Sequence, residues 1–386
     1  MSLGLENAGF RPCYVGEVNL DALGTYLENR GDPDLLRHTC RDVRSIADQE
    51  KCRRIMRSIK DDYDVDELDM ICGGPPCQGF SGIGHRRAFD VSKRDMPYNH
   101  LYKDMARIIS YIRPRSFVFE NVAGLLSGRW TRDGNKGEIW NDVYSCFESL
   151  DYDVGYELLH ARDYGVPQFR PRIIMVGIRK DIRPDYPDTP GGGRLPAPSS
   201  ARPPDPVDLI GDLVDPDYMG KKATTTYLSP PSAPVQHRLR DGLIQGDILT
   251  DQEYSVHADH IRKKFQHMLD HGGEIPEEYK TKKFSQRVVP GRWGADGPNM
   301  TITSSQVDFV HFSQPRHMTV REHARFQTFP DTYKFMGPQQ TGGRRRAGDP
   351  DKGIWDREVP KYTQIANAVP VWLAEAVGRH VASLIR

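Results

Sequence analysis

Asp69-Met-Ile-Cys-Gly-Gly-Pro-Pro-Cys-Gln-Gly-Phe-Ser81 is the stretch on which the predicted fold depends, because a short apolar run passes directly into a turn rich in glycine and proline. The apolar run at 69–74 predicts a buried strand. The prolines fix φ and each lacks a backbone N–H, whereas the glycines permit unusual dihedral angles and close approach of a substrate. Cys77 is therefore presented by the turn rather than packed, and we interpret it as a nucleophile.

Strands and helices alternate on the amino-terminal side of this turn. The pattern predicts a buried strand at 13–19, a helix at 20–29, a strand tip at 39–43 and a charged helix at 46–59. This order predicts an α/β protein with a mostly parallel, doubly wound sheet. Ligands of such sheets bind at the carboxyl ends of the strands.

Acidic side chains fall at these strand ends. Glu17 and Asp42 lie toward the ends of the first two predicted strands, and nucleotide-binding α/β folds place a carboxylate at the position of Glu17 on ribose hydroxyls. For Glu17 a solvated acid is the alternative, and the commoner one in unrelated chains. Glu120 comes directly after the apolar residues 117–119, and burying an acid there is costly unless it has a partner or a task. A structural ion pair is the alternative for Glu120.

Two polar segments flank the predicted strands. Residues 82–98 form a long loop with two basic pairs, Arg86-Arg87 and Lys93-Arg94; beside a nucleophile such a loop is typical of a lid, with a solvated surface loop as the alternative. Residues 152–160 and 172–179 predict a hairpin. Between them Gln168, Arg170 and Arg172 alternate, so an extended backbone would point them to one face, suited to phosphate or base contact. A solvated edge strand is the alternative.

The amino-acid composition of the chain changes near residue 181. Residues 184–206 are dense in Pro, Gly and Ser, and scattered basic clusters follow as far as residue 300, a pattern that a charged surface also explains. We therefore predict a second, smaller, loop-rich domain at 181–335 and a polar insertion at 336–359. A capping box, Thr319 with Glu322, predicts a helix start. An apolar helix at 371–385 should pack back on the first domain, which then comprises 1–180 and 360–386.

The overall composition restricts the partners and the location of the protein only loosely. Lys plus Arg equals Asp plus Glu at 53 each, so overall charge predicts neither a nucleic-acid partner nor a membrane surface, and any polyanion site must be local. The sequence has no signal-peptide pattern and no apolar run long enough to span a bilayer, which favours a cytoplasmic protein. Its six cysteines form no C-x-x-C pair and no zinc spacing, so we expect reduced thiols and no structural metal.

Five motifs in order carry a family resemblance that spans nearly the whole chain. Together they resemble a DNA cytosine-5 methyltransferase of the bacterial restriction-modification type, which implies the S-adenosylmethionine-dependent methyltransferase fold. The motifs are Pro75-Pro-Cys-Gln78, Glu120-Asn-Val122, Gln168-x-Arg-x-Arg172, Arg321-Glu-x-Ala-Arg-x-Gln-x-Phe-Pro330 and Gln364-Ile-Ala-Asn-Ala-Val-Pro370.

The resemblance implies a mechanism. Cytosine C5 is a poor nucleophile, so a thiolate, here that of Cys77, first adds to C6 and leaves at the end. Glu120 would hydrogen-bond N3 and the 4-amino group, for which it needs to be protonated. C5 would then attack the methyl group of S-adenosylmethionine. Because the target atom is inaccessible within a duplex, the cytosine would be flipped out.

The resemblance also assigns roles to further residues. Arg170 and Arg172 would hold the flipped nucleotide or its phosphates and join Cys77 and Glu120 as catalytic residues. Glu17 would bind ribose, Asp42 the adenine amino group, and Asn367 the methionine end. The remaining cofactor contacts implied are Pro75, Leu101 and Ala368, and the DNA contacts implied are Gln78, Ser81, Arg86, Arg87 and Gln168. No site residue is implied for a metal.

Double-stranded DNA is the implied partner, the 181–335 domain would read its sequence, and we expect a monomer with a cognate restriction endonuclease as functional partner. One departure stands out: Met1–Phe10 resembles only the tail of the family's first motif, so the first strand and its glycine turn are missing. A misplaced or truncated start, a strand from another chain, or weak cofactor binding would each explain this. Two alternative functions stay open, a catalytically weak DNA-binding relative and an RNA cytosine-5 methyltransferase.

Overall fold

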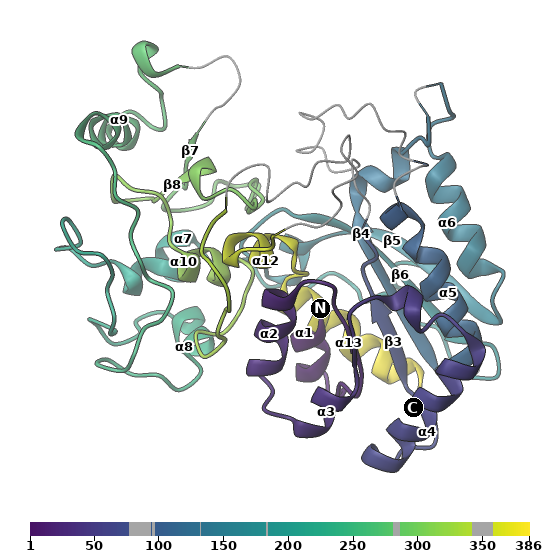
Figure 1. Ribbon diagram of the computed structural model, residues 1–386. Helices are drawn as coiled ribbons and strands as arrows, with labels where there is room; N and C mark the ends of the chain where they lie inside the picture. Colours follow the sequence, from purple (N-terminus) through teal and green to yellow (C-terminus); the bar gives the residue numbers. More distant parts are fainter. Residues whose placement is uncertain (77–93, 95–96, 132, 183, 281–285, 342–357) are drawn as a thin grey trace.

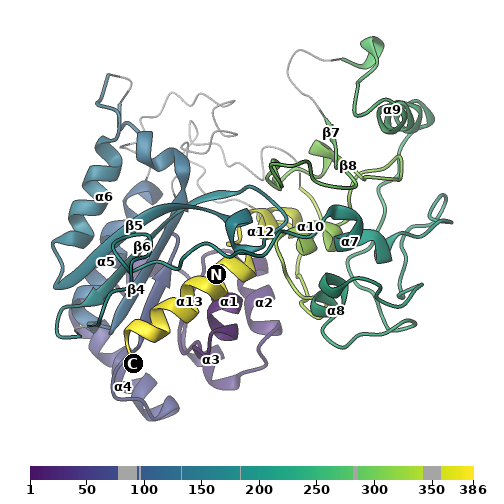
Figure 2. The same ribbon diagram turned by 180° about the vertical axis from the view of Figure 1, so that it is seen from behind.

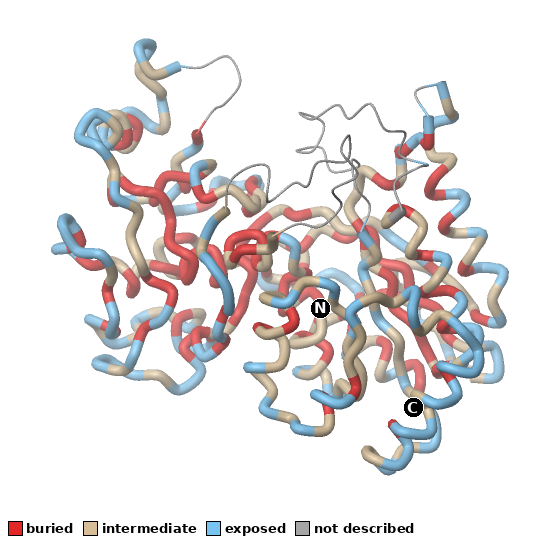
Figure 3. Tube along the Cα trace, viewed as in Figure 1, coloured by how far each residue is buried: buried red, intermediate tan, exposed pale blue. Residues whose placement is uncertain are grey.

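The computed structural model describes the whole chain except residues 77–93, 95–96, 132, 183, 281–285 and 342–357. Two lobes lie side by side (Figure 1). The first lobe contains the main sheet and both termini, and the second is built of short helices and loops. Buried residues concentrate along the strands of the first lobe and where the two lobes meet (Figure 3).

The main sheet is mixed. It has four strands in the order β3-β4-β6-β5, of which β3 and β4 are parallel whereas β4–β6 and β5–β6 are antiparallel. The strands are β3 (Met70–Gly73), β4 (Ser116–Val122), β5 (Tyr152–His160) and β6 (Pro171–Arg179). The predicted hairpin is therefore confirmed.

The prediction of a mostly parallel sheet is wrong for these strands. The connection between β5 and β6 holds only a turn of 3₁₀ helix, too little for the crossover that a parallel pair needs, so β6 returns antiparallel. A separate parallel pair is formed by β1 (Val15–Gly16) and β2 (Thr39–Cys40). The carboxyl ends of β1 and β2 nevertheless carry Glu17 and Asp42, as predicted.

Helices cover both faces of the main sheet, which confirms the doubly wound arrangement. On one face, α5 and α6 pack Ile109 and Phe147 against Phe117 and Phe119 of β4. On the other face lies α13, whose Leu373, Val377 and Val381 meet Val118, Ile174 and Val176 (Figure 2). The helices that the structure describes in this lobe are α1 (Ser2–Asn7), α2 (Leu20–Glu28), α3 (Pro33–Arg37), α4 (Gln49–Tyr63), α5 (Leu101–Ile112), α6 (Glu138–Glu148), α12 (Lys361–Asn367) and α13 (Val371–Leu384).

The amino-terminal helix α1 packs tightly on α13. A Cβ atom at Gly4 would lie 2.3 Å from the carbonyl oxygen of Val371, so only glycine allows this approach. The carboxyl-terminal helix thus returns to the first lobe, as its apolar sequence predicts.

The second lobe has a hydrophobic core of its own. The buried members of this core include Leu209, Tyr227, Leu239, Trp293 and Phe326. Apart from α9 (Asp259–Asp270), the regular elements described in this lobe are short: α7 (Pro206–Ile210), α8 (Pro234–Arg240), β7 (Arg287–Val288), β8 (Phe309–Val310) and α10 (Val320–Phe326). The 3₁₀ helices among the described residues are Val43–Ser45, Pro97–His100, Ala123–Ser127, Ala161–Tyr164, Gly211–Leu213, Glu277–Tyr279 and Gln306–Asp308.

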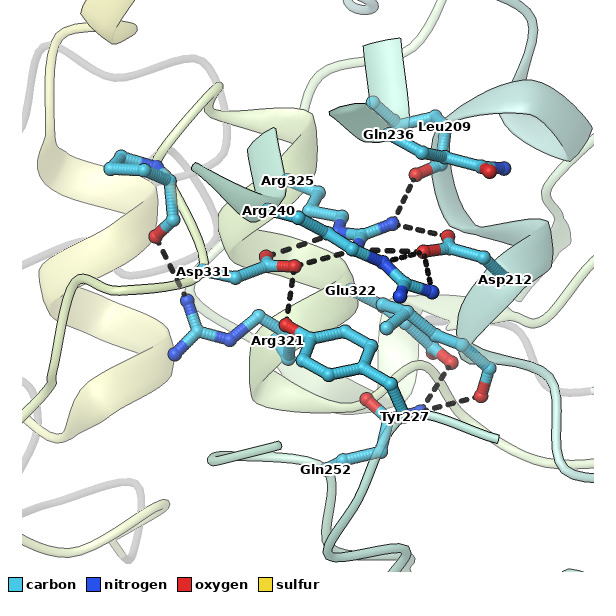
Figure 4. A network of polar contacts seen from close by, with 12 residues as sticks. Leu209, Asp212, Tyr227, Gln236, Arg240, Gln252, Arg321, Glu322, Arg325 and Asp331 are labelled. Atoms are coloured by element: carbon cyan, nitrogen blue, oxygen red, sulfur yellow. Dashed lines mark hydrogen bonds and ion pairs between the residues drawn. The ribbon is translucent and has the colours of Figure 1, made fainter. Parts of the chain in front are cut away.

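Helix α10 lies at the centre of a buried ionic network (Figure 4). Its start is fixed by the predicted capping box, in which Thr319 and Glu322 bond each other's backbone N–H. Arg325 joins the carboxylates of Asp212 and Asp331, and all three side chains are at most 1% exposed. Burying these charges is tolerable only because each is paired. No described helix has the length and apolar character needed to cross a membrane.

Candidate active site

A large cavity opens at the carboxyl ends of the strands. Its volume is about 2190 Å³, and its wall includes Glu17, Pro75, Glu120, Arg172 and Asn367. Glu17 directly follows β1, Pro75 lies in the turn after β3, Glu120 is in β4, Arg172 is near the amino end of β6 and Asn367 ends α12. Segments far apart in the sequence therefore meet around one space, at the sheet edge where ligands of α/β proteins bind.

Glu120 and Arg172 form an ion pair on adjacent strands. The Nε atom of Arg172 lies 2.8 Å from Oε1 of Glu120, and the two side chains are only 11% and 12% exposed. Burial lowers the pKa of Arg172, and the neighbouring Glu120 carboxylate opposes that shift. Glu120 thus has the ion-pair partner that its buried position requires and also borders the cavity; its role in catalysis stays a prediction.

The turn that leads to Cys77 packs closely against the side chain of Glu120. A Cβ atom at Gly74 would lie 2.7 Å from Oε2 of Glu120, so glycine leaves room for the carboxylate. The side chain of Asn121 donates a hydrogen bond of 2.9 Å to the carbonyl of Pro75. These contacts tie the chain just before residue 77 to β4. Cys77, Gln78, Ser81, Arg86 and Arg87 lie outside the described residues.

The wall next to β1 suits a nucleoside. The Glu17 carboxylate accepts a hydrogen bond of 2.8 Å from the backbone N–H of Asn19, and burial raises the pKa of Glu17. Val18 and Leu20, which follow it, are exposed apolar side chains on the cavity wall. A carboxylate for ribose hydroxyls beside apolar side chains for a base fits the adenosine part of S-adenosylmethionine.

Asp42 and Leu101 also line the cavity. Asp42 caps the 3₁₀ helix Val43–Ser45 and is held by Arg44, whose hydrogen bonds lower the pKa of Asp42. Leu101 begins α5. Both residues border the cavity, and their contact with a cofactor stays a prediction. Asp42 would have to share its carboxylate between Arg44 and a ligand.

The structure corrects the placement of two residues of the Gln168-x-Arg-x-Arg segment. Strand β6 begins only at Pro171, and Arg170 has φ of +28°, so the backbone turns and the three side chains do not share a face. Gln168 is fully buried; its amide donates to the carbonyl of Phe326 (2.7 Å) and accepts from the N–H of Ile302 (3.2 Å). It cannot reach DNA without leaving these partners.

Arg170 is equally buried, with 1% exposure, and burial lowers its pKa well below the ordinary value. Its guanidinium donates to the carbonyls of Ala366 and Ala368, so these carbonyls hold its N–H groups, although the residue also borders the cavity. Only Arg172 of this segment meets Glu120. Of the two predicted cofactor contacts nearby, Asn367 borders the cavity, whereas Ala368 offers its carbonyl to Arg170.

Sequence reasoning missed one part of the wall. Residues 301–305 and 307–308 of the second lobe line the cavity, and the hydroxyl of Thr303 donates to Asp308 at 2.6 Å. The hydroxyl-rich run Thr-Ile-Thr-Ser-Ser at 301–305 was the sequence signal from which this part of the wall could have been predicted. The described residues contain no group of three or more His, Cys, Asp or Glu side chains arranged to hold a metal ion.

Known proteins are similar to this chain in sequence and in fold. A family model for the C-5 cytosine-specific DNA methylases matches residues 1–383. The Type II methyltransferase M.XorII of Xanthomonas oryzae is 30% identical, covering 100% of this chain and 82% of its own. The Type II methyltransferase M1.HphI of Haemophilus parahaemolyticus is 28% identical, covering 99% and 84%.

Among solved structures, a DNA modification methyltransferase encoded within an E. coli prophage matches with a TM-score of 0.68 at 22% identity, covering 99% of this chain and 95% of that one, a likeness of fold. The predicted resemblance is confirmed. The chain belongs to the C-5 cytosine-specific DNA methylase family and is a DNA cytosine-5 methyltransferase.

Proposed function

We propose that this enzyme methylates C5 of a cytosine flipped out of a specific double-stranded DNA sequence, through a covalent bond between Cys77 and C6. The observation that carries the proposal is the position of Glu120. It lies at the cavity wall, is held by Arg172 at 2.8 Å, and is packed against Gly74, three residues before Cys77. A flipped base that reached Glu120 would therefore be close to the turn that carries the thiol.

The protein's own residues supply the activation of the base. The Cys77 thiolate forms a bond to C6, and the electron pair displaced from the C5–C6 double bond makes C5 nucleophilic. Glu120, when protonated, donates to N3 and accepts from the 4-amino group, which stabilises the resulting enamine. Arg172 fixes the Glu120 carboxyl group and offers its remaining N–H groups to the nucleotide. Removal of the C5 proton then lets the Cys77 sulfur leave.

S-adenosylmethionine, when bound, supplies the methyl group. We assign its nucleoside to Glu17, Asp42 and Leu101 and its methionine end to the wall near Pro75 and Asn367. The two acids and the apolar Val18 and Leu20 support this assignment, because they form one side of the cavity that Glu120 also borders.

We assign the reading of DNA to the second lobe, residues 181–335, and catalysis to residues 1–180 and 360–386. Two observations support this division: the second lobe has its own hydrophobic core, and its hydroxyl-rich segment 301–305 faces the cavity. Ser81, Arg86, Arg87 and Gln78 stay predicted DNA contacts. The polar segment 336–359 has no assigned role.

A methyl-transfer assay with tritiated S-adenosylmethionine tests the proposal. Wild-type enzyme should label double-stranded DNA, Cys77→Ala should not, and DNA with 5-fluorocytosine at the target should trap a denaturation-resistant complex. Label on RNA alone would show an RNA methyltransferase instead. Retained DNA binding with no label would show a non-catalytic relative, and an active enzyme that traps no complex would remove Cys77 from its role.

A further inference from the structure

A buried junction binds the end of helix α12. Gln327 donates from Nε2 to the carbonyl of Ile365 at 2.6 Å and to that of Ala368 at 3.1 Å. Arg170 donates to the carbonyls of Ala366 and Ala368. The last carbonyls of a helix have no partner within the helix, so these two side chains supply the missing donors. A positive charge at this end also complements the helix dipole.

The junction contains two residues with unusual backbone angles. Arg170 has φ of +28° and Thr328 has φ of +60°, values that favour glycine and are rare for a β-branched residue such as Thr328. The Thr328 hydroxyl accepts from the N–H of Trp372 at 3.1 Å and donates to the carbonyl of Gln327 at 2.7 Å. Such conformations persist where surrounding contacts determine them, and they gather at functional sites.

The same junction reaches three parts of the cavity wall. Asn367 lies between the two alanines whose carbonyls are bound, and Arg172 lies two residues beyond Arg170. On the side of the second lobe, the N–H of Arg170 donates to the hydroxyl of Thr301 at 3.1 Å. Gln168 completes the connection, since its amide donates to Oε1 of Gln327 at 2.8 Å.

Arg170 is suited to this task by its shape. Its planar head reaches the carbonyls of Ala366 and Ala368 at once, with a third contact to Ile302 at 3.5 Å. Lysine, with a single compact ammonium group, cannot reproduce that fork. Among the described residues Arg170 forms no ion pair with a carboxylate, so its buried charge depends on these carbonyls.

We propose that Arg170 and Gln327 are positioning residues that hold the α12 turn so that Asn367 faces the methionine end of the cofactor. The proposal rests on the cofactor assignment made above. Neither side chain would touch the reacting atoms; both act through the backbone of 365–368. Loosening the junction should therefore weaken cofactor binding more than it weakens the fold.

Three variants test the proposal: Arg170→Lys, Gln327→Met and the control Arg240→Lys. Arg240 is as buried as Arg170, at 1%, but it bonds Asp212 and the carbonyl of Ser229, away from the α12 turn. Three measurements are made on each full-length protein without DNA: the Kd for S-adenosylmethionine by equilibrium binding, hydrogen exchange of the 361–370 peptide, and the urea midpoint.

We expect Arg170→Lys and Gln327→Met to raise the Kd at least tenfold and to speed exchange in 361–370. Arg240→Lys should lower the urea midpoint comparably while leaving the Kd within twofold. The proposal is overturned if Arg170→Lys binds the cofactor like wild type, or if all three variants lose affinity in proportion to lost stability. If Arg170→Lys does not fold, the comparison of Gln327→Met with Arg240→Lys decides in the same way.

The outcome separates this proposal from the function on which it rests. A wild-type protein that binds no S-adenosylmethionine would overturn the cofactor assignment and, with it, the cofactor role of the junction. The exchange data would still decide whether Arg170 and Gln327 hold the α12 turn. Wild-type binding with unchanged exchange in 361–370 of both variants would overturn the junction alone.

Discussion

The Nε atom of Arg172 lies 2.8 Å from the Glu120 carboxylate across the β4–β6 ladder, so a cation and an acid meet at the cavity wall with little solvent between them. Replacing Glu120 by Gln keeps its size but removes the exchangeable carboxyl proton. We expect Glu120→Gln to lower kcat by roughly 10²–10⁴, the usual range for loss of acid–base assistance. Glu157→Gln, at an exposed position on β5, is the control. A Glu120→Gln enzyme within tenfold of wild type in methyl transfer would contradict this role.

Gly74→Ala should impair activity through Glu120. The added Cβ would lie 2.7 Å from Oε2 and 3.3 Å from the backbone oxygen of Glu120, so the carboxylate must move. A displacement of this kind at a reacting group can cost about 10²-fold in rate. Gly294→Ala is a matched control, because a Cβ there meets nothing within 4 Å. Steady-state methylation of the two variants checks the difference; equal rates would show that the carboxylate has other room.

Loss of Arg325 should destabilise the second lobe. Its guanidinium joins Asp212 and Asp331, and Arg325→Met would leave two buried carboxylates short of a partner. Removing one member of a buried pair costs about 3–5 kcal/mol of unfolding free energy. The exposed pair of Arg379 with Glu375 provides the comparison, and Arg379→Met should cost at most about 1 kcal/mol. Urea unfolding of both variants measures this, and similar costs would contradict it.

Stability should fall on mild acidification because three histidines are buried in neutral form. Burial lowers the pKa of His311 and His317 to about 3 and that of His323 to about 4, from an ordinary 6.5. Below pH 6.5 the unfolded chain binds protons that the folded chain refuses, so unfolding becomes easier as pH falls towards 4. Each histidine contributes about 1.4 kcal/mol per pH unit in that window.

Urea unfolding at pH 7.5 and 5.5 measures this slope. His323→Gln should flatten it, whereas a change at the exposed His260 should not. A stability that is unchanged between the two pH values would show that the three rings accept protons in the folded state.

Sequence patterns predicted those elements that depend on interactions between residues close together in the chain. The apolar run before Glu120 and the two halves of the β5–β6 hairpin follow from burial and alternation, and the Thr319–Glu322 capping box follows from backbone donors at a helix start. The direction of β6 in the sheet could not be predicted from such a pattern. It depends on a connection too short to cross over, and the mostly parallel sheet expected from the strand–helix alternation is mixed instead.

The acids that line the cavity were placed correctly near strand ends, whereas residues at turns of the chain were not. Glu17, Asp42 and Glu120 sit at strand ends, so their convergence on one cavity follows from the fold. Gln168 does not share a face with Arg172 because strand periodicity does not apply across Arg170, whose φ is +28°. The hydroxyl segment 301–305 joins the wall only because the second lobe approaches the first, which no local pattern encodes.

The return of α13 to the first lobe has a consequence for how the protein is made. One face of the sheet is finished only by Leu373, Val377 and Val381, near the end of the chain. During synthesis on the ribosome, the last strand of the main sheet is complete once Arg179 has been added. That face of the sheet therefore stays uncovered until the second lobe has been synthesised as well. The second lobe, whose buried core residues lie between 209 and 326, can close first. Helix α13, which emerges after the second lobe, thus covers this face of the sheet, and a chain cut short before residue 371 would leave the face open.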